Sequence, residues 1–288
     1  MKRSIIKLIP VAALLIGIAL LLYPSISEYI NSIHQSKAIA NYNKISTNLK
    51  DEEVERFFEE AREYNERLAS TEDTIFYPEK VSGYYDTLDI TGTGIMGYLT
   101  IDKIDLELPI YHSVNENVLQ IAVGHLPGTS LPVGGEGTHT VLSGHRGLVT
   151  ARLFTDLDKM EIGDTFVISV LSEFFTYQVD QIKTVKPYEI DDLRITPGMD
   201  YCTLFTCTPY GINSHRLLVR AHRIENAEDI PKIFVVNEAF RISPVIVTPV
   251  VAAPMLMILF VWMLISVHRQ KKANKNKKDN AQDKRSFV

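Results

Sequence analysis

The residues best equipped for chemistry in this sequence are a cysteine and an arginine on either side of a short loop. Cys207 follows the extended apolar run 203–206 and precedes a loop that contains proline and glycine. Arg216 begins the next β-forming run, nine positions downstream. A hairpin would bring its guanidinium back beside the thiol, where it could donate hydrogen bonds to an oxyanion or to a substrate backbone. We therefore predict a nucleophile at Cys207 and a charge-stabilising group at Arg216.

A cysteine nucleophile needs a nearby base or cation to become a thiolate. Among the eight histidines, His145 and His125 are both flanked by glycines, which keep the backbone clear for a projecting ring. We favour His145 as the general acid/base and keep His125 as the alternative, because separation along the chain says little about distance in the fold. A zinc site of Cys207, His145 and His215 is not expected, because no Cys-x-x-Cys or His-x-x-x-His spacing supports it. No metal or other cofactor is predicted.

The two cysteines of the chain have different expected roles. Cys202 and Cys207 are five positions apart, so on one strand they point to opposite faces and do not bridge. We predict that Cys202 is a small buried hydrophobe and that Cys207 is a free thiol.

Two apolar segments distinguish this chain from an ordinary soluble domain. Residues 5–22 contain a single charge, Lys7, and residues 244–267 contain none. At about 1.5 Å per residue the second segment can cross a hydrocarbon core, and the first is near the lower length limit. No small-residue cleavage site follows the first segment directly, so we predict an uncleaved anchor rather than a removed signal peptide.

The distribution of charge predicts the orientation of these spans. Residues 1–7 carry three basic and no acidic side chains, and residues 268–288 carry eight basic and two acidic ones. The part between the spans holds 19 basic and 33 acidic residues. By the positive-inside rule both termini are expected in the cytoplasm and the acidic middle outside the cell. An acidic middle also argues against a nucleic-acid partner, which requires a basic face.

The region between the spans divides into a helical part and a β-rich part. Residues 46–70 place apolar side chains three and four positions apart, which predicts a helix packed on the following domain. Residues 71–97 have no clear period and are expected to form a long loop. From residue 98 onward the sequence predicts an all-β barrel or sandwich with irregular or helical links at 114–123 and 151–157. The expected strands are 98–101, 108–112, 139–143, 165–171, 174–185, 201–206 and 216–224.

Several segments, in this order, resemble the class C sortases, the pilus-assembling members of the sortase family. The resemblance covers about residues 54–224, and a C-terminal span is also typical of that class. It implies an eight-stranded β-barrel with an N-terminal helical extension, flanked by two transmembrane helices. It also implies that Cys207 is the nucleophile, His145 the general acid/base and Arg216 the substrate or oxyanion stabiliser. The segments are 97–101, 108–112, 124–132, 142–147 and 203–211 with 213–216.

The resemblance implies an extracellular transpeptidase. Cys207 would attack the Thr carbonyl of a Leu-Pro-x-Thr-Gly-like sorting signal, and an amine, in pilus sortases a pilin lysine, would resolve the acyl-enzyme. The expected partners are pilins with C-terminal sorting signals, together with the membrane. The loop 208–214 would shape the sorting-signal pocket, and the predicted substrate-binding residues are Ser143, Thr206, Thr208, Pro209 and Tyr210.

One region departs from the family pattern. Many class C sortases cover the active site with a loop that carries Asp-Pro and an aromatic residue, whereas residues 72–78 read Glu-Asp-Thr-Ile-Phe-Tyr-Pro. The lid candidates are therefore Asp73 and Phe76, separated by two residues and without the proline that would stiffen the loop. We expect a loose cover that blocks Cys207 only in part.

The domain organisation predicted from these observations has seven parts. Two alternatives to pilus assembly stay open: a sortase that attaches proteins to a cell-wall amine, and a non-catalytic extracellular binding protein with two membrane spans. The predicted parts are a cytoplasmic N-terminus (1–4), an anchor (5–22), an extracellular helical region with a lid-like loop (23–97), the catalytic barrel (98–226), a linker (227–243), a second transmembrane helix (244–267) and a basic cytoplasmic tail (268–288).

Overall fold

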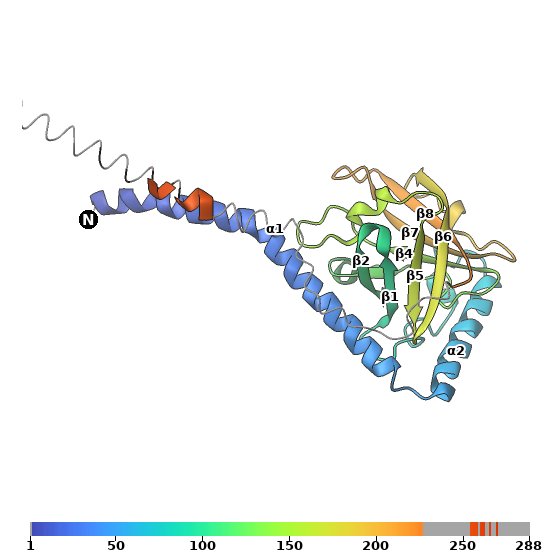
Figure 1. The fold of residues 1–288 in the computed structure, drawn as a ribbon. Coiled ribbons are helices and arrows are strands. Elements are labelled where there is room, and N and C mark those ends of the chain that lie inside the picture. Colours follow the sequence, from blue (N-terminus) through green and yellow to red (C-terminus); the bar gives the residue numbers. More distant parts are fainter. Residues whose placement is uncertain (1, 227–253, 259, 263–264, 266–268, 270–288) are drawn as a thin grey trace, which may run out of the picture. The chain divides into compact units, whose positions relative to one another are not determined.

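The computed structural model describes residues 2–226, 254–258, 260–262, 265 and 269. The chain divides into two units, one formed by Met1–Ile26 with Ala239–Val288 and the other by Ser27–Glu238. The second unit contains a closed β-barrel with two long helices beside it (Figure 1).

The barrel has eight strands in the spatial order β1-β2-β3-β4-β7-β8-β6-β5. The pairs β2–β3 and β4–β7 are parallel, and every other neighbouring pair is antiparallel. This closed, eight-stranded architecture confirms the barrel that the resemblance implied. The strands are β1 (Ile95–Ile101), β2 (Leu106–His112), β3 (Val123–His125), β4 (Thr138–Ser143), β5 (Thr165–Val170), β6 (Glu173–Val185), β7 (Asp200–Thr208) and β8 (His215–Arg223).

The sequence prediction missed one strand. Residues 114–123 were expected to form a single link, but the structure contains the short helix α3 (Glu116–Leu119) and then β3. With three residues, β3 is too short to show a period of two, and its position depends on parallel pairing with β2. The other links are the 3₁₀ helices η1 (Pro78–Lys80), η2 (Asp102–Ile104), η3 (Leu153–Lys159) and η4 (Asp191–Leu193).

The two faces of β7 have different environments. Cys202 and Leu204 are fully buried in the main hydrophobic core, which fills the barrel. Because side chains alternate along a strand, Phe205 and Cys207 lie on the opposite face. On that face Phe205 packs against a separate cluster that includes Val141 and Leu218. Both cysteines are free, as predicted.

The helix α2 (Asp51–Ala69) packs on the barrel domain, as its periodicity predicted. Acidic residues occupy its first turn and Arg67 its last, an arrangement that suits the helix dipole. Phe58 is buried and its ring lies 6.3 Å from that of Phe175 on β6. Asn65 docks the helix on the β3–β4 connection, because its side chain donates to the carbonyl of Leu131 at 3.2 Å and accepts from its amide at 2.7 Å.

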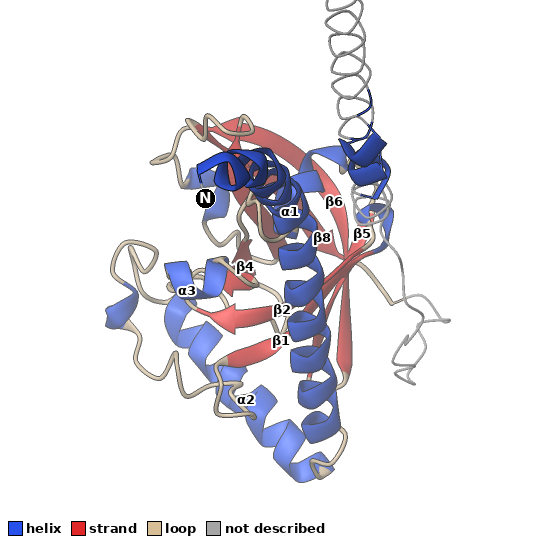
Figure 2. Ribbon diagram, turned by 90° about the vertical axis from the view of Figure 1, so that its left-hand side faces the viewer, coloured by secondary structure: helices blue, strands red, loops and turns tan. Residues whose placement is uncertain are grey.

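The helix α1 (Lys2–Ser46) extends well beyond the predicted anchor, and its C-terminal part belongs to the same unit as the barrel. Figure 2 shows this part of α1 beside β1 and β2. Ile39 and Tyr42 form a buried cluster with Ile95 and Tyr98. The hydroxyl of Tyr42 donates to the carbonyl of Met96 at 2.9 Å, which fixes the helix to β1.

Among the described residues, one helix is long and apolar enough to cross a membrane. It is the segment Leu14–Ser46 near the N-terminus, which overlaps the anchor predicted at residues 5–22. Most of the second predicted span, 244–267, lies outside the described residues. The parts of it that are described, including 254–258 and 260–262, are helical.

Candidate active site

The register of β7 and β8 places the predicted nucleophile opposite the predicted cation. Cys207 pairs directly with Arg216 in the antiparallel ladder. Opposed residues in such a ladder share a face, with Cβ atoms about 5 Å apart. Arg216 uses one guanidinium nitrogen to donate to the carbonyls of Asn213 and His215, at 3.1 and 3.0 Å, and forms no ion pair with a described carboxylate. Its other donors therefore meet no carboxylate in the part of the chain that the structure describes.

The parallel pairing of β4 with β7 brings His145 to the same place. Ser143, the last residue of β4, pairs with Phe205, so His145 and Cys207 each follow two residues beyond this pair. Two hydrogen bonds continue the pairing past the end of β4, since the amide of Gly144 donates to the carbonyl of Phe205 at 3.1 Å and the hydroxyl of Thr206 donates to the carbonyl of Gly144 at 2.7 Å. Adjacent β-strands thus bring Cys207, His145 and Arg216 together.

Glycine is required at position 144 for a steric reason. A Cβ there would lie 2.7 Å from the ring of Phe154, a fully buried residue of the core. The amide of Phe154 also donates to the carbonyl of His145 at 3.0 Å. The loop that carries His145 is therefore pressed against η3 and held there on both sides of the histidine.

Known proteins share this arrangement of strands and loops. The matching family model is that of the sortase domain, and it covers residues 99–224. The crystal structure of sortase C1 from Streptococcus agalactiae is 47% identical in sequence, with a TM-score of 0.61, over 66% of this chain and 100% of that chain. The chain belongs to the sortase family. A sortase C structure from Streptococcus pneumoniae, 44% identical with a TM-score of 0.61 over 66% of this chain and 97% of that one, agrees with class C.

Curated sortases match a shorter region. Sortase A of Streptococcus agalactiae is 26% identical over 117 residues, which are 40% of this chain and 47% of that protein. Sortase D of Bacillus subtilis is 31% identical over 114 residues, 40% of this chain and 54% of that protein. The chain thus spans about half the length of these curated relatives.

The alternative histidine of this sortase occupies a structural position. His125 is fully buried in β3. Its Nε2 lies 2.8 Å from the carbonyl of Ser130 and its Nδ1 2.9 Å from the hydroxyl of Tyr84, so both ring nitrogens are engaged. Burial lowers the pKa of His125 to about 4. A neutral, enclosed ring with two partners is suited to packing and has no route to a substrate.

These buried histidines predict that the barrel loses stability in mild acid. The pKa of His139 is also lowered to about 4 by burial, from an ordinary value of 6.5. Depressed pKa values mean that the stability each group contributes is present above about pH 6.5 and is lost as the pH falls toward 4, by about 1.4 kcal/mol per pH unit per group. We expect urea unfolding, followed by circular dichroism, to show this slope in the full chain.

The substitution His125→Gln should reduce the slope of unfolding free energy against pH by the contribution of one histidine, about 1.4 kcal/mol per pH unit, because glutamine does not titrate. The control Asn117→Ala alters an exposed side chain that does not titrate and should leave the slope unchanged. Equal pH dependence in wild type and His125→Gln would contradict the assignment of a neutral buried ring.

The predicted substrate-binding residues fall into two groups. Pro209 and Tyr210 are exposed in the β7–β8 loop, and Thr208 is half-buried, so all three border the site. Thr206 is 1% exposed and its hydroxyl is bonded to Gly144, and Ser143 is also buried. The burial of Thr206 and its bond to Gly144 do not support a substrate contact there, and that role stays a prediction. Thr206 instead supports the loop of His145.

Two charged residues of the site were missed by the sequence analysis. Arg146 donates to Asp158 at 2.5 Å and to the hydroxyl of Thr208 at 3.3 Å, so it connects the His145 loop to η3 and to the end of β7. Glu116 on α3 lies 3.5 Å from His145. Arg146 could have been identified as a site residue because it follows His145 directly in the sequence. Nothing in the sequence indicated that α3, and with it Glu116, would face the ring of His145.

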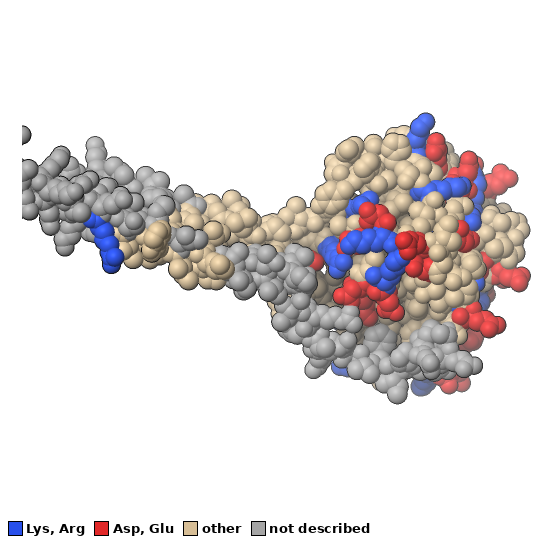
Figure 3. Space-filling model, turned by 45° about the horizontal axis from the view of Figure 1, so that its top comes forward, with Lys and Arg blue, Asp and Glu red and all other residues tan. Residues whose placement is uncertain are grey.

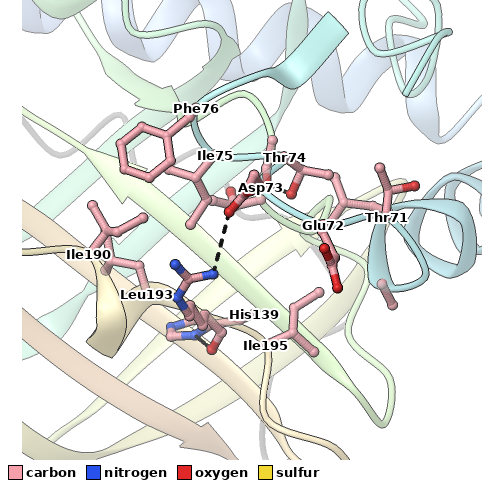
Figure 4. Close-up of a pocket in the computed structure, with 15 residues that line it drawn as sticks. Thr71, Glu72, Asp73, Thr74, Ile75, Phe76, His139, Ile190, Leu193 and Ile195 are labelled. Carbon is pink, nitrogen blue, oxygen red and sulfur yellow. Dashed lines mark hydrogen bonds and ion pairs between the residues drawn. The ribbon is translucent and has the colours of Figure 1, made fainter. Parts of the chain in front are cut away.

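The lid candidates lie along the same face, toward the far end of β4. Asp73 is 4.0 Å from Arg194, an arginine of the β6–β7 connection, and this ion pair is the dashed line in Figure 4. Thr74 is buried and its hydroxyl donates to the carbonyl of Gly128 at 2.8 Å. Phe76 is 56% exposed. The segment is therefore seated on the barrel, but its aromatic ring faces solvent.

A cavity of about 300 Å³ lies under this segment, between it and the β6–β7 connection. His139 lines the cavity and pairs with Tyr201, six residues before Cys207 on β7. At about 3.3 Å per residue the backbone of Tyr201 is about 20 Å from that of Cys207. Ile75, which also lines the cavity, packs on the same hydrophobic cluster as Phe205.

Surface charge on the barrel is mixed rather than segregated. Figure 3 shows basic and acidic side chains interspersed on the face in view. Lys103, for example, pairs with both Glu161 and Asp164, at 2.6 and 2.8 Å.

Proposed function

We propose that this sortase is a membrane-anchored cysteine transpeptidase that joins pilin subunits. The observation that carries the proposal is the cross-strand pair of Cys207 and Arg216, with the His145 loop hydrogen-bonded beside it. The class C relatives support the choice of substrate, since the Streptococcus pneumoniae enzyme has a pilin substrate specificity.

The first half of the reaction forms a thioester. The Cys207 thiol passes its proton to His145 as the sulfur attacks the Thr carbonyl of a Leu-Pro-x-Thr-Gly-like signal, and the carbonyl oxygen becomes an oxyanion. Arg216 donates hydrogen bonds to that oxyanion. The Thr–Gly bond then breaks, and His145 transfers its proton to the leaving amine.

The second half transfers the acyl group to an amine. A neutral lysine amine of the next pilin attacks the thioester carbon, and the C–S bond breaks. The proton lost by the amine passes to His145, which returns it to the leaving sulfur of Cys207, so both groups regain their starting state. Water can take the place of the amine in a slower hydrolysis.

Intact mass spectrometry of the full chain in detergent micelles tests this function. Incubation with a Leu-Pro-x-Thr-Gly peptide should add the acyl mass to Cys207. A pilin-type lysine peptide should then discharge the adduct faster than an oligoglycine amine. Faster discharge by oligoglycine would favour wall attachment, and no adduct at all would favour a non-catalytic binding protein.

The proposed topology has two spans and both termini in the cytoplasm. It is supported by the apolar helix near the N-terminus and by the basic residues that flank both predicted spans. Reporters fused before Met1 and after Val288 should both read cytoplasmic, and protease added to intact protoplasts should cut only the part between the spans. An extracellular reporter at Val288 would overturn the two-span arrangement.

We further propose that residues 71–78 are a loose cover over the site. Asp73 and Arg194 are each about half-exposed and 4.0 Å apart, and exposed ion pairs of this kind are weak. The double variant Asp73→Ala/Phe76→Ala should raise the rate at which a small thiol reagent modifies Cys207 only a few-fold, about 1 kcal/mol or less of gating. Arg194→Ala, which removes the partner of Asp73, should give a similar rise.

The size of the increase in the Cys207 modification rate distinguishes a loose cover, a tight lid and a segment that does not cover the thiol. A hundredfold increase would mean a tight lid, which contradicts a loose cover. An unchanged rate in all variants would mean that residues 71–78 do not cover Cys207.

A further inference from the structure

One ring nitrogen of His145 faces an acidic side chain outside the Cys207–Arg216 pair. Nε2 of His145 is buried and lies 3.5 Å from Oε2 of Glu116. Among the described residues, this nitrogen has no hydrogen-bond partner. The side chain of Glu116 is 68% exposed, while that of His145 is 28% exposed. A buried polar nitrogen is costly unless it finds an acceptor, and the Glu116 carboxylate is close enough to serve as one.

The carboxylate of Glu116 is held in place by its own helix. The side-chain amide of Gln120 donates to Glu116, and this bond, together with the neighbouring His145, holds the pKa of Glu116 below its ordinary value. Asn115 caps α3, because its side chain accepts from the amide of Val118 at 3.1 Å. Glu116 therefore presents a fixed negative charge to the histidine.

The long helix α1 braces both segments that meet here. Gln35 donates to the carbonyl of Ile121, just after α3, at 2.7 Å. Asn31 donates to the carbonyl of Thr150, in the loop that follows His145, at 2.9 Å. With the backbone of His145 also fixed by Phe154, rotation of the imidazole about its side-chain bonds is the main freedom left.

We propose that Glu116 is a positioning residue for His145, whose Nε2–H it accepts, so that Nδ1 is the nitrogen that exchanges protons with the reacting groups. In a neutral imidazole one nitrogen donates and the other accepts, so a fixed acceptor on one side selects the tautomer. A carboxylate also stabilises the imidazolium formed during the reaction, as in other triads. The proposal rests on the proposed function, in which His145 is the general acid/base.

The alternative is that Glu116 is an ordinary surface charge with no effect on the reaction, as many exposed ion pairs are. Steady-state cleavage of a sorting-signal peptide by the full chain separates the two. Glu116→Ala should lower kcat about tenfold and leave the KM for the peptide within twofold, because the residue touches His145 and not the substrate. Glu116→Gln keeps an acceptor oxygen and should recover part of the loss. Asn117→Ala, an exposed neighbour on α3, should stay within twofold of wild type.

A spectroscopic measurement tests the contact between Glu116 and His145 without turnover of substrate. Long-range ¹H–¹⁵N correlation of the histidine rings, with the His145 signals assigned from a His145→Gln variant, reports which nitrogen carries the proton. Wild type should show the Nε2–H tautomer, and Glu116→Ala a mixture of the two. A purely structural role for Glu116 would alter thermal stability without changing this ratio.

The outcomes separate the two proposals. If wild type fails to cleave the peptide while its His145 shows the Nε2–H tautomer, the proposed function fails and the contact stands. An unchanged kcat in Glu116→Ala of an active enzyme overturns the positioning role alone. An Nδ1–H tautomer in wild type overturns it as well, whatever the kinetics.

Discussion

Replacing Cys207 with alanine should abolish cleavage of a sorting-signal peptide. The thiol lies opposite Arg216 and two residues beyond the point where β7 meets the His145 loop, so it is the nucleophile placed among these groups. Without its sulfur no thioester can form, and a histidine and an arginine alone offer no covalent path. We expect the rate, followed by release of the glycine-containing fragment, to fall to background, and the acyl adduct to disappear from the mass spectrum.

The matched control is Cys202→Ala on the same strand. Cys202 is fully buried in the core, and its thiol lies on the opposite face from Cys207. Its loss removes one small buried group and should leave most of the activity. A comparable loss of activity in both folded variants would show that the nucleophile has been misassigned.

The substitution His145→Ala should lower turnover by at least about a hundredfold, as is typical when a general acid/base is removed. Both half-reactions lose a proton carrier, so acyl-enzyme formation and its discharge by an amine should slow together. Stopped assays with the peptide alone and with a lysine acceptor measure the two steps separately. The acyl adduct should still form slowly, because Cys207 and Arg216 remain.

The informative comparison is with His125. Its ring is buried between Ser130 and Tyr84, so His125→Gln should reduce the free energy of unfolding while leaving the turnover of the folded protein near that of wild type. If the folded His125 variant were the inactive one, and His145→Ala remained active, the choice between the two glycine-flanked histidines would be wrong.

Some elements were predictable because local chemistry specifies them. The helix at 46–70 follows from a side-chain period of about 3.6, and seven of the strands follow from short runs rich in Val, Ile, Leu, Thr and Phe between Gly, Pro and Asp clusters. The observed bounds differ from these by a few residues. Strand β3 was not predictable, since three residues carry no period and its pairing depends on β2. The helical continuation of α1 to Ser46 likewise depends on the packing of Ile39 and Tyr42 against β1.

For the site, the sequence by itself determined which groups could react. A cysteine before a Pro/Gly loop, an arginine at the start of the next strand and a glycine-flanked histidine are chemical facts of the chain, and so are its apolar segments and its acidic middle. A hairpin is a local structure, which is why the pairing of Cys207 with Arg216 could be foreseen and is confirmed by the register.

Only the tertiary structure decided which histidine stands beside the thiol and what surrounds it. His145 and His125 have similar local sequences, but His145 follows β4 in a half-buried position in register with Cys207, whereas His125 is enclosed in the barrel wall. The same is true of Glu116, of the inward-facing Thr206 and of Asp73 beside Arg194. These contacts join residues tens of positions apart along the chain, and no local preference encodes them, because they arise only when the closed barrel sets the neighbours of each strand.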